Sequence, residues 1–246
     1  MPLYNFFGIS KPMTGENMFL YLFFGFISGA VIPFMARRFG KLIPMDPGLI
    51  VLKLAHLPRF PQIRDINRQE LLKKLWRKLW LSSFLWGSLM ALLFSLSFFF
   101  LPPSFNVWGC VFCWIQGISM AIDARYWLLP DFFTIPLILL GFLFCHLHSE
   151  IGLNFALVGS IAGYLICFFS VFLMGLFSKK TMFGGGDLKM ITALGGWLGI
   201  LGLNYTLILS FLLFIILNSL PIQKKGAYGP ALGIASIIVF FITYVK

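Results

Sequence analysis

Charged side chains are scarce in this sequence, and acidic ones are the scarcest. Only 11% of the 246 residues are charged, with eight Asp or Glu in total, whereas 59% are hydrophobic. The mean hydropathy is +0.92. So few charges exclude an ordinary soluble domain, which needs a polar surface. The composition therefore predicts an all-α, polytopic bundle of membrane-spanning helices.

Long polar stretches are also missing, because apolar runs follow one another with mostly short connections. The first run is followed by Ala36-Arg37-Arg38 rather than by a small-residue cleavage site, so we interpret it as a retained anchor. Between the sixth and seventh runs, Gly202-Leu203-Asn204 is expected to form a turn. The runs predict about eight transmembrane segments, at about 18–36, 81–101, 105–122, 132–147, 153–177, 188–203, 205–220 and 227–245.

The positions of the basic residues predict the direction in which these segments cross. With the N-terminus outside, only Lys11 and Lys246 of the 19 basic residues fall on the outer side. Basic loops stay in the cytoplasm, so we expect a multi-pass protein of the bacterial cytoplasmic (inner) membrane with both termini outside. The same distribution explains the net charge of +11. We therefore expect the lipid bilayer, and not nucleic acid, to be the partner of the basic residues.

The largest predicted loop, residues 37–80, carries eleven of the basic residues and ends in an amphipathic stretch. In RQELLKKLWRKLWL (68–81), leucines and tryptophans share one helical face and lysines and arginine share the other. A helix of this kind lies in the headgroup plane and binds anionic lipid. We therefore expect 68–81 to form a surface helix before the second span begins.

Three acidic residues stand at ends of predicted spans: Asp123, Asp131 and Asp187. In the predicted topology all three lie at the cytoplasmic face, and an ionisable group at such a depth is a functional candidate. Two carboxylates in a partly dry site share a proton. The ionised one can then activate a water while the protonated one polarises a peptide carbonyl. This is aspartic-protease chemistry, which needs no metal and no cofactor.

Three glycines, Gly184, Gly185 and Gly186, come directly before Asp187. Because glycine has no Cβ, we expect this loop to pack closely against a neighbouring helix, to adopt positive φ and to admit a substrate backbone. The alternative is a flexible turn in which Asp187 only caps the next helix. The GGGD sequence alone does not separate the two.

The stretch AIDARYWLLPD (121–131), followed by GGGDLK (184–189), resembles the type IV prepilin peptidase family of GxGD-type membrane aspartyl proteases. Members carry the first Asp in D-x-R-x-x-x-I/L-P-N/D and the second in G-x-G-D, and the resemblance covers roughly 110–245. It implies that Asp123 and Asp187 are the catalytic pair. It also implies that Asp131, where the family has Asn or Asp, is a helix cap or loop brace.

The resemblance further implies the substrates, which are prepilins or pseudopilins of type IV pili or type II secretion, cleaved behind their leader at the cytoplasmic face. Gly229-Pro230-Ala231-Leu232 resembles the Pro-Ala-Leu element near the active site of presenilin-type proteases. Pro230 is therefore a candidate supporting residue, although proline in a first helical turn needs no function. Lys189 either tunes Asp187 electrostatically or serves only the topology.

The chain departs from the family in its N-terminal part. Many members carry two Cys-x-x-Cys pairs in the first cytoplasmic loop, similar to a zinc site, but 37–80 has no cysteine. Many also methylate the new N-terminus with S-adenosylmethionine, yet their G-S-F-x-N-V motif is matched only loosely by residues 29–38. The sequence leaves methylation open. We expect no metal site and interpret the four cysteines, all in predicted spans, as packing residues: Cys110, Cys113, Cys145 and Cys167.

We expect two parts: 1–104, with the anchor, the basic loop and the second span, and 105–246, the membrane-embedded peptidase core. Gly195, Gly199 and Gly202 share a helical face and are expected to let the apolar helix of a substrate pack closely. The alternative function is an ion- or proton-coupled transporter that uses Asp123 and Asp187. Transporters usually place such acids near the midplane between inverted repeats, and no repeat is visible.

Overall fold

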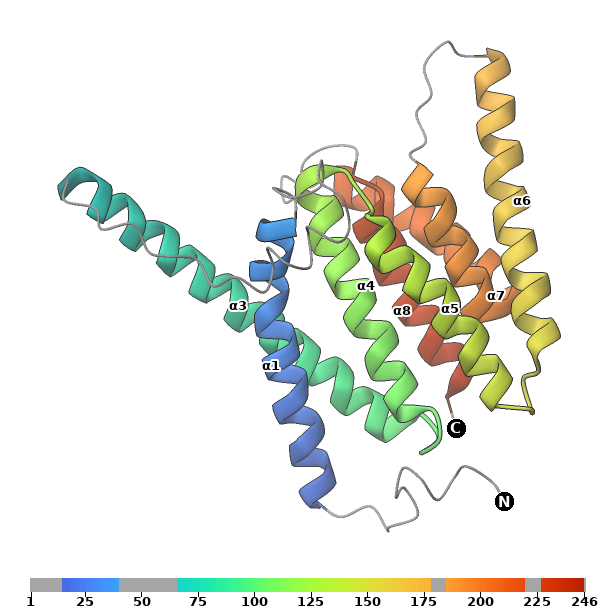
Figure 1. Ribbon diagram of the computed structural model, residues 1–246, viewed down its shortest axis with the longest axis horizontal. Coiled ribbons are helices and arrows are strands. Elements are labelled where there is room, and N and C mark those ends of the chain that lie inside the picture. Colours follow the sequence, from blue (N-terminus) through green and yellow to red (C-terminus); the bar gives the residue numbers. More distant parts are fainter. Residues whose placement is uncertain (1–14, 40–65, 178–184, 220–226, 246) are drawn as a thin grey trace. The chain divides into compact units, whose positions relative to one another are not determined.

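The computed structural model describes residues 15–39, 66–177, 185–219 and 227–245. In these ranges the only regular secondary structure is α-helix, which confirms the predicted all-α class (Figure 1). The chain forms two compact units, 1–99 and 100–246. Each is described by itself.

The first unit pairs α1 (Gly15–Phe39) with α3 (Ile66–Phe100). Glycines let the two helices approach closely: a Cβ added to Gly29 would lie 2.4 Å from the carbonyl oxygen of Trp86, and one on Gly25 would lie 2.8 Å from Cα of Ala91. These distances are shorter than any real Cβ contact. The pair is therefore a close-packed helical hairpin of the small-residue type that membrane helices use.

The basic stretch 68–81 does not form a separate surface helix. It belongs to α3, which runs without interruption for 35 residues from Ile66 to Phe100. A helix lying in the headgroup plane would need a bend before the span, and α3 continues straight into it as one element. The described basic side chains of this stretch, Lys74, Arg77 and Lys78, are exposed, as is Trp80 at 70%.

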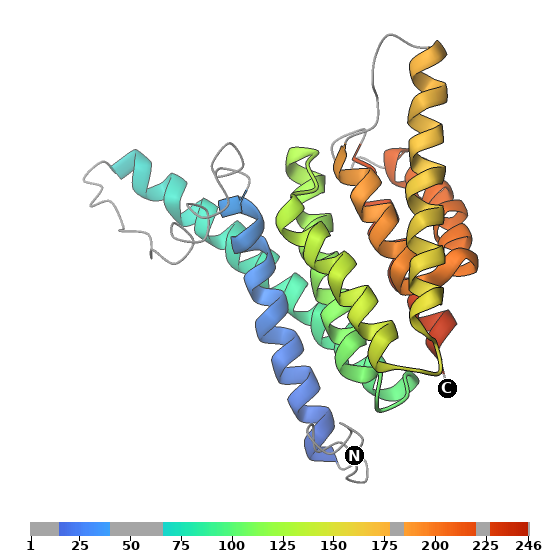
Figure 2. The ribbon, with the colours of Figure 1, turned by 45° about the vertical axis from the view of Figure 1, so that its right-hand side comes forward.

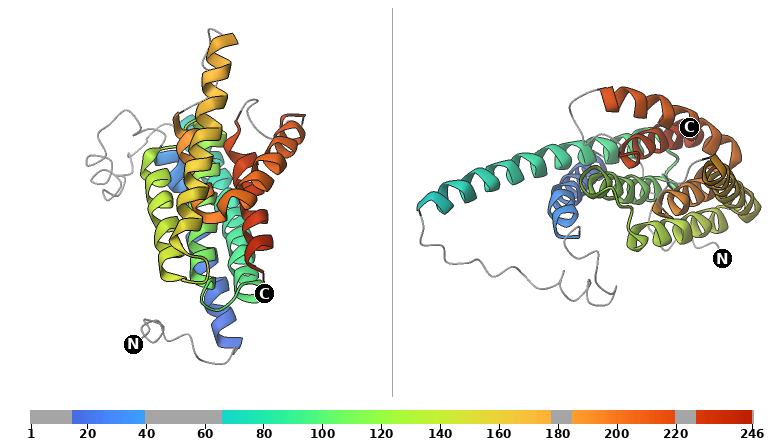
Figure 3. Two further views of the ribbon diagram at one scale, coloured as in Figure 1. Left: turned by 90° about the vertical axis from the view of Figure 1, so that its right-hand side faces the viewer. Right: turned by 90° about the horizontal axis from the view of Figure 1, so that it is seen from above.

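The second unit is a bundle (Figures 2 and 3). Its helices are α4 (Asn106–Tyr126), α5 (Asp131–Leu147), α6 (Leu153–Phe177), α7 (Gly185–Ser219) and α8 (Gly229–Tyr244).

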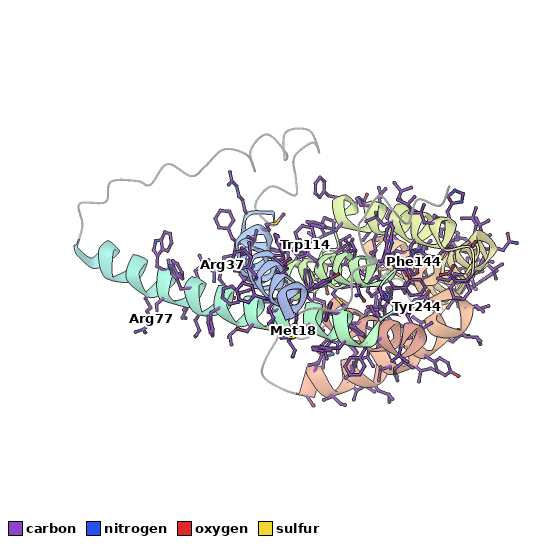
Figure 4. All side chains as sticks on the ribbon, turned by 90° about the horizontal axis from the view of Figure 1, so that it is seen from below. Met18, Arg37, Arg77, Trp114, Phe144 and Tyr244 are labelled. Atoms are coloured by element: carbon purple, nitrogen blue, oxygen red, sulfur yellow. The ribbon has the colours of Figure 1, made fainter. Side chains whose placement is uncertain are left out.

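An aromatic cluster forms the core of this unit. The Trp197 ring is fully buried and stacks on Phe144 with 5.2 Å between ring centroids, and its Nε1–H donates to the Leu137 carbonyl at 2.8 Å. The hydroxyl of Tyr244 donates to the Trp197 carbonyl. Figure 4 shows Phe144 and Tyr244 close together within the bundle. The cluster joins α5, α7 and α8.

Helix α7 is broken at Gly199, where φ is 65° and ψ is −176°. Three contacts reveal the direction of its two arms. Gly186 packs on Leu129, just after the end of α4 that binds the start of α8, Trp197 bonds Tyr244 at the end of α8, and Ser210 bonds Tyr228 at its start. The arms therefore run antiparallel, one down and one up the length of α8. The prediction of two segments holds, but the turn predicted at 202–204 was wrong.

Five described helical stretches are long and apolar enough to cross a membrane: Met18–Arg38, Lys74–Phe100, Asn106–Tyr126, Leu153–Leu173 and Gly185–Ser219. Two shorter apolar helices, Asp131–Leu147 and Gly229–Tyr244, pack beside them in the second unit. These findings confirm a polytopic membrane bundle. With α7 divided at Gly199, the described residues form eight helical segments, and the two arms of α7 lie within one of the five stretches that are long and apolar enough to cross.

Candidate active site

Asp123 lies near the C-terminal end of α4 and is buried, with 5% of the residue exposed. Its Oδ2 accepts a hydrogen bond from the backbone N–H of Gly229, the first residue of α8, at 2.7 Å. A Cβ on Gly229 would lie 2.6 Å from that oxygen. Only glycine therefore fits between the carboxylate and the helix terminus, where partial positive charge favours an anion.

Pro230 directly follows this glycine and occupies the first turn of α8. Proline suits such a position because its φ is already helical and it removes no intrahelical hydrogen bond there. The Gly-Pro pair thus starts α8 at the point where its first N–H reaches Asp123. The Pro-Ala-Leu element predicted to support the site does lie beside the first acid.

The loop from α4 to α5 contacts the start of α7. Trp127 ends α4 in the left-handed conformation, with φ 56°, and the loop then reaches the buried Leu129. A Cβ on Gly186 would lie 2.7 Å from the Leu129 carbonyl oxygen. The glycine therefore allows the two motif-bearing segments to touch. The expected close packing is present, but the neighbour is the loop between α4 and α5 and not a helix.

The positive φ expected of these glycines is absent from the two that the structure describes. Gly185 and Gly186 are helical residues, and neither adopts positive φ. That part of the prediction was wrong, because α7 already begins at Gly185. A Cβ on Gly185 would meet no atom within 4 Å. Gly184 lies outside the described residues.

Asp131 and Lys189 form an ion pair, with 2.6 Å between Oδ2 and Nζ. Asp131 is the first residue of α5, but its side chain makes no capping hydrogen bond, and Pro130 occupies the cap position. Of the two roles expected for Asp131, the structure therefore shows the brace and not the cap. The brace joins the start of α5 to the first turn of α7.

Asp187 lies in the first turn of α7 and is half-buried. It interacts electrostatically with the phenol of Tyr228, the residue before Gly229. Asp123 is held at the start of α8 by the Gly229 N–H, and Asp187 lies in the same first turn of α7 as Gly186, which packs on the loop after α4. Asp131, Lys189 and Gly186 lie at the same end of the bundle, in the first turns of α5 and α7.

Sequence reasoning missed Tyr228, whose hydroxyl is hydrogen-bonded to Ser210 on the second arm of α7. This pair fixes the segment before α8 to α7 and so holds Gly229 in place. The sequence did contain a signal for Tyr228, because this residue directly precedes the Gly229-Pro230 pair. The contact with Ser210 requires α7 to reverse at Gly199, whereas the sequence predicted the turn at 202–204.

The glycines expected to receive a substrate helix are filled by the bundle itself. A Cβ on Gly195 would lie 2.1 Å from the carbonyl oxygen of Gly159 on α6, and one on Gly199 would lie 2.3 Å from the Phe155 ring. Gly202 faces Val239 and Thr243 of α8. The expectation of a substrate surface on this face was wrong.

The four cysteines are buried within the helices with free thiols, and Cys145 Sγ lies 3.6 Å from the Gly196 carbonyl. Among the described residues, no three His, Cys, Asp or Glu side chains are grouped to hold a metal ion.

The comparisons with known proteins agree with this arrangement. Residues 110–219 match the model of the type IV leader peptidase family. A prepilin leader peptidase/N-methyltransferase of Dickeya chrysanthemi is 36% identical over 141 residues, covering 54% of this chain and 50% of the relative. Proteins of the same name from Neisseria gonorrhoeae and Klebsiella pneumoniae are 38% identical over 122 residues and 40% over 102.

These two alignments cover 48% and 42% of this chain, and 43% and 45% of the relatives. The chain thus spans about half the length of the curated relatives it matches. No solved structure matches it. The two aspartate motifs, the loop between α4 and α5 and both arms of α7 all fall inside the matching region, so through residues 110–219 the chain is similar to the type IV leader peptidase family.

Proposed function

We propose that the chain is a membrane aspartyl endopeptidase of the GxGD type. It cleaves the leader from type IV prepilins or pseudopilins at the cytoplasmic face of the bacterial inner membrane. The observation that carries the proposal is the buried Asp123 on the Gly229 N–H, together with the contact of the Asp187-bearing start of α7, through Gly186, with Leu129 in the loop that follows α4. The names of the relatives supply the substrate class.

The proposed activity implies a two-carboxylate mechanism. Oδ2 of Asp123 is occupied by the Gly229 N–H, so the proton that the pair shares resides on Oδ1 of Asp123 or on Asp187. The ionised carboxylate removes a proton from water as the water oxygen attacks the scissile carbonyl carbon, while the protonated carboxyl donates to the carbonyl oxygen. The tetrahedral intermediate then collapses, and a proton passes to the leaving amine nitrogen.

The remaining predicted site residues position the segments that carry the two acids. Gly186 lets the start of α7 reach Leu129, and Lys189 braces it to Asp131. Pro230 occupies the first turn of the helix whose Gly229 N–H binds Asp123. Relatives that align over the core are named peptidases, and this favours a peptidase over a transporter using the same acids. We assign the peptidase to 105–246 and membrane anchoring to 1–104.

Co-expression with a prepilin, followed by mass spectrometry of its N-terminus, tests the proposal. Asp123→Asn and Asp187→Asn should each abolish cleavage at unchanged membrane levels, because one carboxylate cannot act as both base and acid. Asp131→Asn should keep substantial activity, since an amide still accepts a hydrogen bond from Lys189. Cleavage by either single catalytic variant would overturn the assignment.

The same experiment addresses cofactors. A two-carboxylate mechanism needs no metal, so a chelator should leave cleavage unchanged. Several relatives are named N-methyltransferases as well, and the mass of the mature N-terminus reports whether a methyl group from S-adenosylmethionine is added. Reporter fusions at 128–130 and 149–151 test the location, with the first expected in the cytoplasm and the second outside.

A further inference from the structure

Four polar atoms in the core of the second unit have no hydrogen-bond partner among the described residues. They are Oε1 and Nε2 of Gln116 and Oγ of Ser119 on α4, and Oγ1 of Thr134 on α5. The three residues are buried, with exposed fractions of 0%, 1% and 0%. Buried helical hydroxyls such as those of Thr206 and Ser236 instead donate to a carbonyl of the preceding turn. A buried polar atom without a partner is costly, so these four require an explanation.

Gln116 and Ser119 lie on the face of α4 that carries Asp123, because their spacing of three and four residues repeats with the helical turn. Two contacts on this face bracket Gln116. Oδ2 of Asp123 accepts a hydrogen bond from the Gly229 N–H, and the Phe112 ring stacks on a ring of α8 with 4.6 Å between centroids. Gln116 therefore lies inside the interface of α4 with α8, about 10 Å along the helix from Asp123.

Thr134 faces the same part of the interior from α5. It shares a helical face with Gly141, two turns further along, where an added Cβ would lie 2.8 Å from the Trp197 ring. Phe112, on the face of α4 that carries Gln116, also contacts Trp197, with 5.1 Å between ring centroids. Both polar faces therefore turn toward the first arm of α7.

The three side chains also lie at one level of the bundle. Helices α4 and α5 are antiparallel, and the rings of Phe105 and Phe144 meet with 5.3 Å between their centroids. Thr134 is 10 residues before Phe144, and Gln116 and Ser119 are 11 and 14 residues after Phe105. Because two antiparallel helices rise equally per residue, the three residues reach a similar height. Their unpartnered atoms therefore border one region of the core.

The chemistry of the four atoms identifies the ligand that suits this region. The Gln116 amide needs an acceptor for Nε2 and a donor for Oε1, whereas the two hydroxyls can take either role. A cation cannot accept from Nε2, and an anion cannot donate to Oε1. A polypeptide would have to part α4 from α8 to reach a residue with 0% exposure. Water both donates and accepts, and a buried water typically makes about three hydrogen bonds to groups that are otherwise unsatisfied.

We propose that Gln116, Ser119 and Thr134 bind a short chain of internal water molecules that leads along α4 toward Asp123. Ser119 lies one turn from Asp123 on the same face. Since the Gly229 N–H occupies Oδ2 of that carboxylate, Oδ1 is the oxygen that the chain of water reaches. The chain is the store from which hydrolysis draws its water. This role as a store rests on the proposed peptidase function, whereas the water site itself does not.

Hydroxyl-radical footprinting of the full chain in detergent tests the water site. X-rays generate radicals from bound water, the radicals oxidise the side chains beside it, and mass spectrometry identifies the modified residues. Met120 and Phe112, one turn to either side of Gln116, should be oxidised in the unmodified protein. Met90, which is fully buried in the hairpin of α1 and α3, is the dry reference. Oxidation of Met120 and Phe112 as low as that of Met90 would overturn the proposal.

The variant Gln116→Leu removes the amide donor and acceptor together. We expect oxidation at both reporter positions to fall to that of the dry reference. The midpoint of thermal unfolding should also fall, because the two hydroxyls lose the water that satisfies them. A dry, unpartnered amide predicts the opposite, since its removal is stabilising, so a raised or unchanged midpoint would contradict the proposal.

Ser160→Ala is the matched control. The Ser160 hydroxyl also has no partner among the described residues, but it lies against Gly196, at the contact of α6 with α7. This variant should keep the oxidation of Met120 and Phe112. An equal loss of oxidation in Ser160→Ala and Gln116→Leu would show a general effect on packing and would overturn the assignment to Gln116.

Kinetics test the role as a store. Gln116→Leu should lower kcat for prepilin cleavage and leave KM nearly unchanged, because it withholds water and does not touch the substrate. An unchanged kcat in a variant that has lost the oxidation would overturn this role. If the unmodified protein cleaves no prepilin, the proposed function fails, and the water site is still decided by the oxidation pattern alone.

Discussion

Asp123 accepts a hydrogen bond from the backbone N–H of Gly229. A substitution of Gly229 therefore tests the site as directly as a substitution of Asp123. In Gly229→Ala the new Cβ would lie 2.6 Å from Oδ2 and 2.8 Å from Cγ of Asp123. The carboxylate must then move and lose its hydrogen bond. We expect cleavage of a co-expressed prepilin to be lost while membrane levels and thermal unfolding change little. Full activity in this variant would show that the contact is dispensable.

The glycines before Asp187 form a matched pair for a second test. A Cβ on Gly186 meets the Leu129 backbone at 2.7 Å, whereas one on Gly185 meets nothing within 4 Å. We expect Gly186→Ala to lower turnover strongly and Gly185→Ala to remain close to wild type, measured at equal membrane levels. Equal effects of the two substitutions would mean that flexibility, and not close packing, matters here.

At this scale the sequence predicts which acids are catalytic, and that stays a prediction, but it does not predict their contacts. Asp123 and Asp187 follow from their motifs and from the cost of an ionisable group at that depth. The Gly229 contact joins residues 106 positions apart, and no local pattern encodes such a pairing. Positive φ was expected from the glycine run, but helix α7 already includes Gly185 and Gly186.

Among the elements, the starts of α5 and α7 are joined by the pair of Asp131 and Lys189. Both side chains are partly exposed, at 56% and 39%, and an exposed ion pair contributes at most about 1 kcal/mol. We expect Lys189→Glu to reduce cleavage by no more than about fivefold. The double variant Asp131→Lys/Lys189→Glu should recover part of that loss, because it restores attraction with the charges exchanged.

A double-mutant cycle on cleavage rates measures this coupling. If the double variant is as impaired as the product of the two single effects, the pair does not brace the helices. The sequence predicted an acid of structural use at position 131 but offered two roles for it. Pro130 decides between them, since it occupies the cap position of α5 and leaves the Asp131 side chain free to reach α7.

The reversal of α7 shows where sequence reasoning about elements stops. Length alone required two crossings, since one helix of 35 residues is longer than a bilayer needs. The turn was expected at Gly202-Leu203-Asn204, which has the composition of a turn. The chain breaks at Gly199 instead because Phe155 of α6 packs against that glycine, and such a contact is a property of the folded bundle.

For the molecule as a whole, we expect the buried aromatic cluster of the second unit to contribute strongly to stability. Trp197 is fully buried and stacks on Phe144, so Trp197→Ala should cost about 3–5 kcal/mol. We expect a lower midpoint of thermal unfolding in detergent. Leu201→Ala, at a residue 70% exposed toward lipid, is the control and should unfold close to wild type. Equal midpoints would place the stabilising core elsewhere.

The all-α class and the membrane location followed from composition. A chain with 59% hydrophobic residues has an apolar surface, which a lipid bilayer covers and water does not. The pairing of helices did not follow, because every predicted span is apolar around most of its circumference. Contacts such as Gly159 with Gly195 choose the neighbours by shape. Shape complementarity between two stretches far apart in the chain cannot be seen in either stretch alone.

The break at Gly199 also bears on how the protein enters the membrane during synthesis. The arm of α7 before Gly199 is too short to cross hydrocarbon of about 30 Å unaided. Because the arms are antiparallel, the insertion machinery would receive them as one hairpin, with Lys189 and the chain after Ser219 remaining on the side from which they entered. A side chain at position 199 would oppose φ of 65° by about 1–2 kcal/mol. Its first effect would therefore fall on biogenesis, before any substrate is met.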